Sequence, residues 1–409
     1  MDQSPPCQRF PLPVENPVDH SPTWQELRES KQIPQVELPT GETAFLLSRY
    51  EDARQVLVNP AFSRCAVATR QREGLVSLES FGPSIIDLDP PEHTRLRQSL
   101  AGAFTPARVE GLRPHVERRA DELVTAMLDN GPPVDLMSAY ADPLALTVIC
   151  ELLGLPFADG SRFRAWSVQI MSMGSEEDTS SVRAREEFLA YLRGLADDRR
   201  MSPQDDLLTA LLSTHGEEAD RLSEAELVTM GAVLVVAAMS PANFLGRAVP
   251  WLLRSPDLYM EFGSASPDRL GKLVEELLRI VSQTEITVPR LATKDVEISG
   301  TTIPAGSLVI PGLASANRDE SEFADPARFN EYRPEIHRHI AFGGGPHYCA
   351  GAPLARLELA AALSTLSRRV PTLRLAIPEA ELRRRTTTFT QGIEKVPVTW
   401  DRPEGGKAG

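Results

Sequence analysis

The chain carries AFGGGPHYCAG at residues 341–351, and the Ala352-Pro353 pair that follows opens a helical pattern. This glycine-rich loop brings a single cysteine, Cys349, to the N-terminus of a helix. The helix dipole and the free N–H groups at such a position lower the pKa of a thiol, so Cys349 is expected to favour its thiolate form. On residue chemistry alone, a functional cysteine and a buried structural thiol remain equal alternatives.

The surroundings of Cys349 argue against two common kinds of site. No Gly-Lys-Ser/Thr sequence follows the glycines, as a phosphate-binding loop requires. The other cysteines, Cys7, Cys65 and Cys150, lie far apart without a CxxC pair. Neither a disulfide framework nor a structural zinc site is therefore expected. A single soft ligand suits haem iron.

The composition is that of an ordinary globular protein, with 409 residues of which 42% are hydrophobic and 24% charged. The formal net charge of -14 argues against a nucleic-acid partner, because phosphate neutralisation needs a basic face. Residues 1–13 lack a basic stretch followed by an apolar run, so neither a signal peptide nor a membrane anchor is expected. The sequence predicts a cytoplasmic protein.

The pattern along the chain predicts one domain over residues 1–409, mainly α with small β-sheets (α+β). Residues 1–40 are expected to be irregular and residues 401–409 to form a flexible tail, and no linker of flexible composition divides the rest. The middle of the chain, from about 91 to 278, shows mostly helical periodicity. Further elements are predicted as strands at 44–47, 296–298, 301–303, 308–310 and 396–400, a helix after the first strand, and a helix at 352–369.

The longest predicted helix runs through the middle of the chain. Ser223 and Glu226 match a capping box, with Leu222 as its hydrophobic staple. The helical pattern then continues to about Leu253. The apolar stretch Leu227–Met239 is too short to cross a bilayer, which needs roughly 20 apolar residues. We interpret it as buried core.

The segment from Phe342 to Gly351 resembles the haem-binding loop of the cytochrome P-450 superfamily, matching Phe-Gly-x-Gly-x-His-x-Cys-x-Gly at all six defined positions. Glu276-Leu-Leu-Arg279 resembles the Glu-x-x-Arg signature of that family. Without the cysteine loop, Glu276 and Arg279 would be interpreted as an ordinary i,i+3 pair on a helix surface. Further stretches resemble soluble bacterial members in the same order: DPPEHTRLR at 89–97, FTP at 104–106, ANRD at 316–319, FADP at 323–326 and RF at 328–329.

The resemblance implies haem b as cofactor, with Cys349 as the axial thiolate and O2 as co-substrate. It also implies a charge network in which Glu276 and Arg279 fold the cysteine pocket. Without the family match, a histidine and an arginine four residues apart would indicate a solvated helix face. The residues that match the family's haem-binding positions, including its propionate partners, are His93, Arg97, Arg290, His347 and Phe342.

The long helix departs from the family pattern, which places an acid followed by a threonine near the haem to relay protons. Here residues 236–241 read VAAMSP, so Met239 replaces the acid and Ser240 the threonine. Pro241 lacks an N–H and clashes with the carbonyl of Ala237, which predicts an opening of the helix. Either Ser240, water and a substrate group deliver protons, or oxygen activation is reduced.

The segments that resemble substrate-facing parts of the family are mostly apolar: 72–86, 166–174, 236–240, 286–288 and 391–393. Methionine would give an adaptable lining, although at helical spacing it is more often core filler. The resemblance points to a large, apolar natural product in the tailoring of a polyketide, macrolide or peptide antibiotic. The candidate lining residues are Met171, Met173, Val236, Met239, Ile286 and Val288.

The main hypothesis is a haem-thiolate monooxygenase that hydroxylates or epoxidises its substrate. No GxGxxG fingerprint of a flavin or nicotinamide site occurs, so electrons are expected from a separate ferredoxin and ferredoxin reductase. A monomer is expected. The first alternative is oxidative ring closure, such as methylenedioxy-bridge formation, because the Ser-Pro replacement loosely resembles family members that do this. Two others are a peroxide-driven haem oxidase and a haem protein that binds a ligand without oxidising it.

Overall fold

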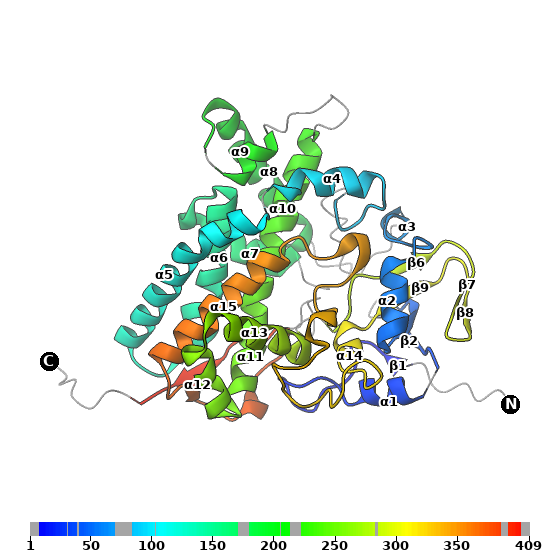
Figure 1. Ribbon diagram of the computed structural model, residues 1–409. Helices are drawn as coiled ribbons and strands as arrows, with labels where there is room; N and C mark the ends of the chain where they lie inside the picture. The colour runs from blue at the N-terminus through cyan, green and yellow to red at the C-terminus, as the bar shows by residue number, and fades with distance from the viewer. Residues whose placement is uncertain are drawn as a thin grey trace.

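Helices dominate the chain, as the sequence predicts (Figure 1). The computed structural model describes residues 8–30, 32–38, 41–69, 84–102, 104–170, 180–204, 206–212, 222–282, 285–385 and 392–401. The helices in these ranges are α1 (Thr23–Glu29), α2 (Tyr50–Val58), α3 (Cys65–Thr69), α4 (Glu92–Ala101), α5 (Pro106–Asn130), α6 (Asp142–Leu153), α7 (Gly160–Ile170), α8 (Ser180–Met201), α9 (Leu207–Leu212), α10 (Glu224–Ala238), α11 (Ser240–Leu253), α12 (Pro256–Ser264), α13 (Pro267–Val281), α14 (Leu313–Ala316) and α15 (Ala352–Arg369).

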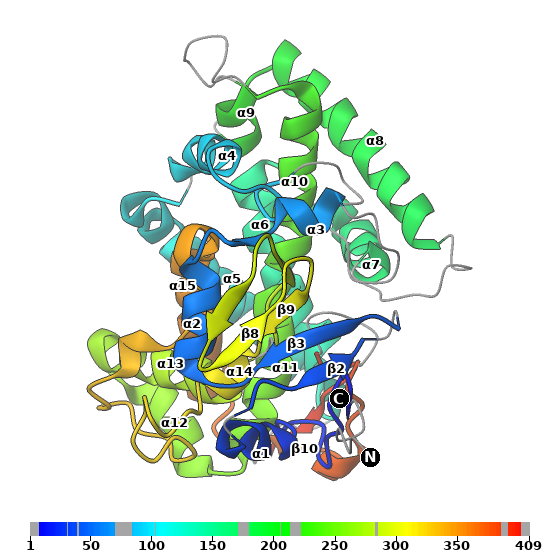
Figure 2. The same cartoon turned by 90° about the vertical axis from the view of Figure 1, so that its right-hand side faces the viewer.

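The strands form three small sheets at one side and at the base of the helices. The six-stranded sheet has the order β1-β2-β3-β9-β6-β4, and β3 pairs in parallel with β9 so that Ala44 lies opposite Leu308. Figure 2 shows β2, β3 and β9 side by side. The strands are β1 (Gln8–Arg9), β2 (Gln35–Glu37), β3 (Thr43–Leu47), β4 (Phe62–Ser63), β5 (Val134–Asp135), β6 (Arg290–Ala292), β7 (Val296–Ile298), β8 (Thr301–Ile303), β9 (Leu308–Pro311), β10 (Arg374–Leu375) and β11 (Pro397–Thr399).

Most predicted elements are confirmed. The strands expected at 296–298, 301–303 and 308–310 are β7, β8 and β9, and the helix expected at 352–369 is α15. The N-terminal segment differs from the expectation, because residues 8–38 contain β1, α1 and β2 rather than irregular chain. Its strands form through pairing with β3, a tertiary contact that local periodicity does not reveal.

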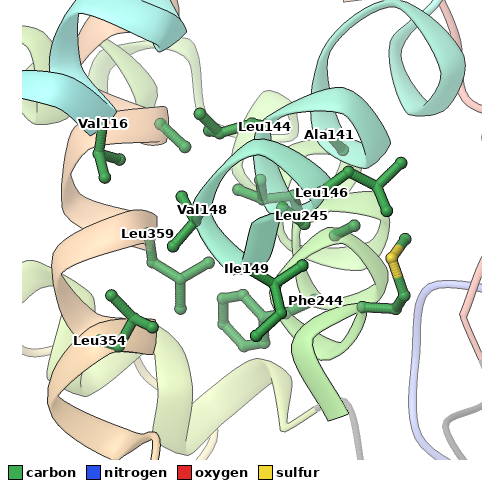
Figure 3. Packing of buried hydrophobic residues seen from close by; sticks show 14 of the residues in the cluster. Val116, Ala141, Leu144, Leu146, Val148, Ile149, Phe244, Leu245, Leu354 and Leu359 are labelled. Atoms are coloured by element: carbon green, nitrogen blue, oxygen red, sulfur yellow. The ribbon is translucent and has the colours of Figure 1, made fainter. Parts of the chain in front are cut away.

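The main core lies where α15 packs against α5 and α6 (Figure 1). Figure 3 shows Leu354 and Leu359 of α15 facing Ile149 of α6 and Phe244 of α11, with Val116 of α5 at the edge. All five side chains are at least nine-tenths buried. Complete burial of an aliphatic or aromatic side chain stabilises a fold by roughly 1.5–3 kcal/mol, so this contact fixes α15 firmly in the molecule.

The capping box predicted for the long helix is present. The Ser223 N–H lies 2.8 Å from the Glu226 carboxylate, and the Glu226 N–H lies 3.2 Å from the Ser223 hydroxyl. The combined span Glu224–Leu253 is long and apolar enough to cross a membrane, contrary to the length argument from the apolar stretch alone. However, 78% of its most apolar window is buried inside the protein, so packing identifies it as core.

The long helix is divided at Met239 into α10 and α11, as Pro241 predicts. The Met239 N–H turns back to the carbonyl of Val236 at 3.4 Å, and helical bonding resumes with the Asn243 N–H and the Met239 carbonyl at 3.2 Å. Pro241 lies in the first turn of α11, where its missing N–H costs least. The carbonyl of Ala237 consequently loses the donor that would continue the helix.

Glu358 is an isolated carboxyl group within the α15 core. It is 2% exposed, and its Oε1 atom has no hydrogen-bond partner among the described residues. Burial raises the pKa of Glu358 from 4.5 to about 8. The unfolded chain therefore releases this proton at lower pH than the folded protein, and stability must decrease as pH rises between these two values.

We predict that Glu358→Gln removes this loss of stability at high pH. The variant should melt roughly 5 °C above the wild type at pH 8 and show no such advantage near pH 5, where the wild-type carboxyl is protonated in the folded state. Differential scanning calorimetry of the intact protein at both pH values measures the effect. Glu186→Gln, at an exposed position on α8, is the matched control. An equal gain at both pH values would contradict the assignment.

Candidate active site

The loop before α15 holds Cys349 through its own backbone. The Cys349 N–H donates to the carbonyl of Phe342 at 3.0 Å, and the Tyr348 N–H donates to the carbonyl of Gly345 at 3.1 Å. Gly345 has a φ of 65°, and a Cβ atom there would collide with the carbonyl oxygen of Leu57 in α2. Glycine is thus required both by conformation and by the close approach of α2.

The Cys349 thiol is exposed, yet protein atoms surround it closely enough that burial raises its pKa. An exposed sulfur with so many neighbours lines a recess rather than a convex surface. Backbone N–H groups of Gly351 and Ala352 and the charges of Arg97 and Arg356 act in the opposite direction and lower the pKa. The net direction differs from the sequence expectation because desolvation outweighs the helix terminus.

The central helix is buried along most of its length but not near its end. Residues from Leu227 to Val236 of α10 are all buried, whereas the next residue, Ala237, is exposed. The other exposed residues of α10 are Glu224 and Ala225 in its first turn. The break at Met239 lies two residues beyond Ala237, so the exposed residue and the opened helix are adjacent.

A cluster of cationic side chains lies beside the cysteine loop. The rings of His93, on α4, and His347 are 4.4 Å apart between centroids. Burial and the charge of Arg290 lower the pKa of His347 to about 3, while burial and the charge of Arg64 lower that of Arg290 to about 10. Both ring nitrogens of His93 and Nε of Arg290 are buried without a hydrogen-bond partner within the described ranges.

This cluster carries more positive than negative charge. Arg64 pairs with Asp87 at 3.1 Å, whereas Arg97 and Arg290 form no salt bridge with any carboxylate of the described residues. Asp89 lies near but accepts hydrogen bonds from the Arg64 N–H and the Ser63 hydroxyl. Buried cations need an anionic partner, so the arrangement suits a ligand that brings carboxylates of its own.

Glu275 connects the cysteine loop to two helices. Its carboxylate lies 2.8 Å from Nε2 of His339, and 2.5 and 3.0 Å from the guanidinium of Arg356 on α15. Burial alone would raise its pKa, but these partners hold the pKa of Glu275 at about 2. The Arg356 guanidinium in turn lies 4.5 Å from the ring centroid of Phe342, a cation–π contact between α15 and the loop.

Glu276 and Arg279 form a buried pair and not the exposed pair that their spacing alone suggests. Both side chains are 0% exposed, with two N–O contacts of 2.8 and 2.7 Å. Arg279 also donates to the carbonyls of Asn317 and Pro326 at 2.8 and 2.9 Å. Arg333 approaches the same Glu276 carboxylate at 3.4 Å. This network ties α13 to the irregular chain that precedes the cysteine loop.

The residues expected to line the substrate site, together with Ser240, differ in how deeply they are buried. Ser240 and Val288 are half-buried. Met171 and Met173 lie outside the described residues. The buried members of the set are Val236, Met239 and Ile286.

Several residues of the site were not singled out by sequence. Arg64 belongs to no motif, and only its placement in space reveals it. Glu275 stands next to Glu276 on the buried face of α13, a pair of carboxylates on an amphipathic helix that could have signalled a network. Arg356 follows Cys349 by two helical turns on α15.

Comparisons with known proteins extend over nearly the whole chain. The cytochrome P450 family model matches residues 270–371. The chain is 40% identical over 379 residues to the mycinamicin IV hydroxylase/epoxidase of Micromonospora griseorubida, an alignment that covers 92% of this chain and 94% of that protein. It is 38% identical over 393 residues to the nocardicin C N-oxygenase of Nocardia uniformis subsp. tsuyamanensis, covering 95% and 98%.

Solved structures give the same result. The crystal structure of HinD with NMFT and NO superposes with a TM-score of 0.87 at 37% identity, covering 97% of this chain and 100% of that chain. Cytochrome P450mel 107F1, described as having biaryl coupling reactivity, gives a TM-score of 0.87 at 34% identity, covering 96% and 100%. With its fold, its cysteine loop and relatives of this similarity, the chain belongs to the cytochrome P450 family and is a monooxygenase of that family.

Proposed function

We propose that the protein is a haem-thiolate monooxygenase that hydroxylates or epoxidises a fairly large, apolar natural product in antibiotic tailoring. The observation that carries this proposal is the cluster beside Cys349, where the buried Arg290 and the half-buried Arg97 form no salt bridge with a carboxylate of the described residues and the buried ring nitrogens of His93 have no hydrogen-bond partner there. Haem, when bound, supplies oxygen activation, and a thiolate ligand favours cleavage of the O–O bond. Two relatives whose names state a substrate act on mycinamicin IV and nocardicin C, which supports the class of substrate.

The residues present fit haem b. Cys349 would ligate the iron, and within the described ranges no group of three or more His, Cys, Asp or Glu side chains offers a competing metal site. Two propionates would supply the carboxylates that the cation cluster lacks, and the unpartnered His93 nitrogens and Arg290 Nε provide donors for them. The residues proposed to hold the propionates are His93, Arg97, Arg290 and His347, with Phe342 contributing to the haem-binding loop.

Electrons are proposed to come from a separate ferredoxin and ferredoxin reductase, since the sequence has no nucleotide fingerprint of its own. We further propose a cytoplasmic monomer. The burial of the long apolar helix supports a protein that keeps this helix inside its own core.

Oxidative ring closure is the second candidate. The helix break at Met239 places no carboxylate at the position where the family has one, and Ser240 is the hydroxyl that remains beside the break. Ser240 would pass a proton through water or through a substrate hydroxyl, which general acid catalysis permits for any positioned donor. The structural similarity to a cytochrome P450 with biaryl coupling reactivity supports keeping this outcome open to test.

We predict that Cys349→Ser abolishes the thiolate signature. The reduced wild-type protein under carbon monoxide should show the strongly red-shifted Soret band of thiolate-ligated haem, and the variant should lack it because a hydroxyl is a far weaker donor. Cys65→Ser, at a cysteine outside the loop, should leave the band unchanged. An imidazole-type spectrum from the wild type would rule out the proposed ligand.

The cation cluster predicts faster haem loss from Arg290→Met. A hydrogen bond to a charged group contributes about 1.5–3 kcal/mol, so haem should leave the variant about tenfold faster or more. Transfer of haem to excess apomyoglobin measures the rate. Arg183→Met removes an arginine whose side chain is 82% exposed and should not change it. Equal rates for all three proteins would argue against a propionate contact at Arg290.

The double change Met239→Glu/Pro241→Thr tests the proton route. It restores an acid and an unbroken helix, so the ratio of product formed to NADPH consumed should change more than the affinity for substrate does. A screen of macrolides, polyketides and peptides for a spin-state shift of the iron would first supply the substrate. Efficient turnover with peroxide but none with redox partners would instead favour a peroxide-driven oxidase.

A further inference from the structure

A buried ion pair joins two segments of the chain that are distant in sequence. Oε1 of Glu285 lies 2.5 Å from Nη2 of Arg384, and the two side chains are 0% and 3% exposed. Nδ1 of His20 lies 3.6 Å from the same carboxylate oxygen. The N-terminal segment, the chain after α13 and the chain after α15 therefore meet at one carboxylate.

The surrounding groups keep Glu285 and Arg384 charged and His20 neutral. Burial and the charge of Arg247 lower the pKa of His20 to about 3. Burial alone would raise the pKa of Glu285, but His20 and Arg384 hold it at about 2. Arg247 belongs to α11 and fastens the nearby backbone by donating to the carbonyls of Val18, Asp19 and Ser282.

Glu285 begins the segment that leads to the cation cluster. Its carbonyl accepts from the Ala314 N–H at 3.2 Å, which fixes the start of the segment. The far end is fixed at Pro289, whose carbonyl accepts from Arg64, and at Arg290 in the cluster itself. Residues Ile286–Val288 thus span the distance between the ion pair and the proposed propionate site.

Arg384 belongs to the segment that packs on the opened helix. It forms a β-bridge with Ile393. A Cβ atom on Gly392 would lie 2.6 Å from Oδ1 of Asn243 and would collide with it, so the backbone of this segment rests directly on α11. The Asn243 N–H donates its helical hydrogen bond to the carbonyl of Met239, the residue at the helix break. The 392–393 segment therefore lies against α11 near the helix break at Met239.

We propose that the Glu285–Arg384 pair is a positioning element that sets the separation between Ile286–Val288 and the 392–393 segment, and thereby selects ligands by size. A buried ion pair adds little net stability compared with apolar side chains of similar volume, so its distinctive contribution is geometric. The inference rests on the proposed function, because it takes both segments to face the space above the haem.

The test compares two ligands that bind haem iron through a nitrogen atom, imidazole and the bulkier 4-phenylimidazole, by optical titration of the holoenzyme. Single variants leave one buried charge unpaired and are prone to unfold, so the decisive protein is Glu285→Gln/Arg384→Met. It should retain haem and the thiolate signature. Its affinity for 4-phenylimidazole should fall at least fivefold, while that for imidazole stays within twofold.

Two control variants separate positioning from general destabilisation. Arg254→Met removes an exposed pair with Asp19 and Glu379 close to the same cluster and should leave both affinities unchanged. Arg384→Lys keeps a cation and should retain most of the selectivity. An unchanged affinity ratio in the double variant, an equal loss for both ligands, or loss of haem would each overturn the inference. A wild type without the thiolate signature would instead refute the proposed function.

Discussion

Two adjacent carboxylates of α13 hold the cysteine loop in place. Consecutive helical residues point about 100° apart, so Glu275 and Glu276 reach different parts of the molecule. Glu275 binds His339 and α15, and Glu276 binds Arg279 and the irregular chain before the loop. Removing one partner of a buried pair costs about 3–5 kcal/mol. The placement of Cys349 at the start of α15 depends on both pairings being intact.

The long helix is buried along most of its length and is broken at one point, Met239. Before the break, α10 is buried from Leu227 to Val236, and Ala237 is exposed. Below it, α11 supports the 392–393 segment. Proline lies in the first turn of α11, and most of the residues of α10 and α11 on either side of the break are buried. The helix break is therefore enclosed within the packed core.

Local patterns predicted much of this molecule. The strand at 44–47, the helix at 352–369 and the loop around Cys349 each follow from a few neighbouring residues. The strand at 35–37 did not, because it exists only through pairing with a distant partner. The pKa of Cys349 was expected to fall, but the surrounding protein raises it. Arg64 reaches the cation cluster from a stretch without any motif, so only the three-dimensional structure reveals it.

The parallel pairing of β3 with β9 has a consequence for synthesis of the chain. β3 cannot pair with β9 before Leu308, the partner of Ala44, has been synthesised. The sheet therefore cannot be completed until most of the polypeptide has left the ribosome. Contacts between residues so distant in sequence slow folding, whereas the helices between them can assemble from nearer neighbours. Leu46, fully buried in the finished sheet, stays without its partner strand during this interval. Until β9 is made, the nascent β3 can pair only with its near neighbour β2 and leaves its other edge open.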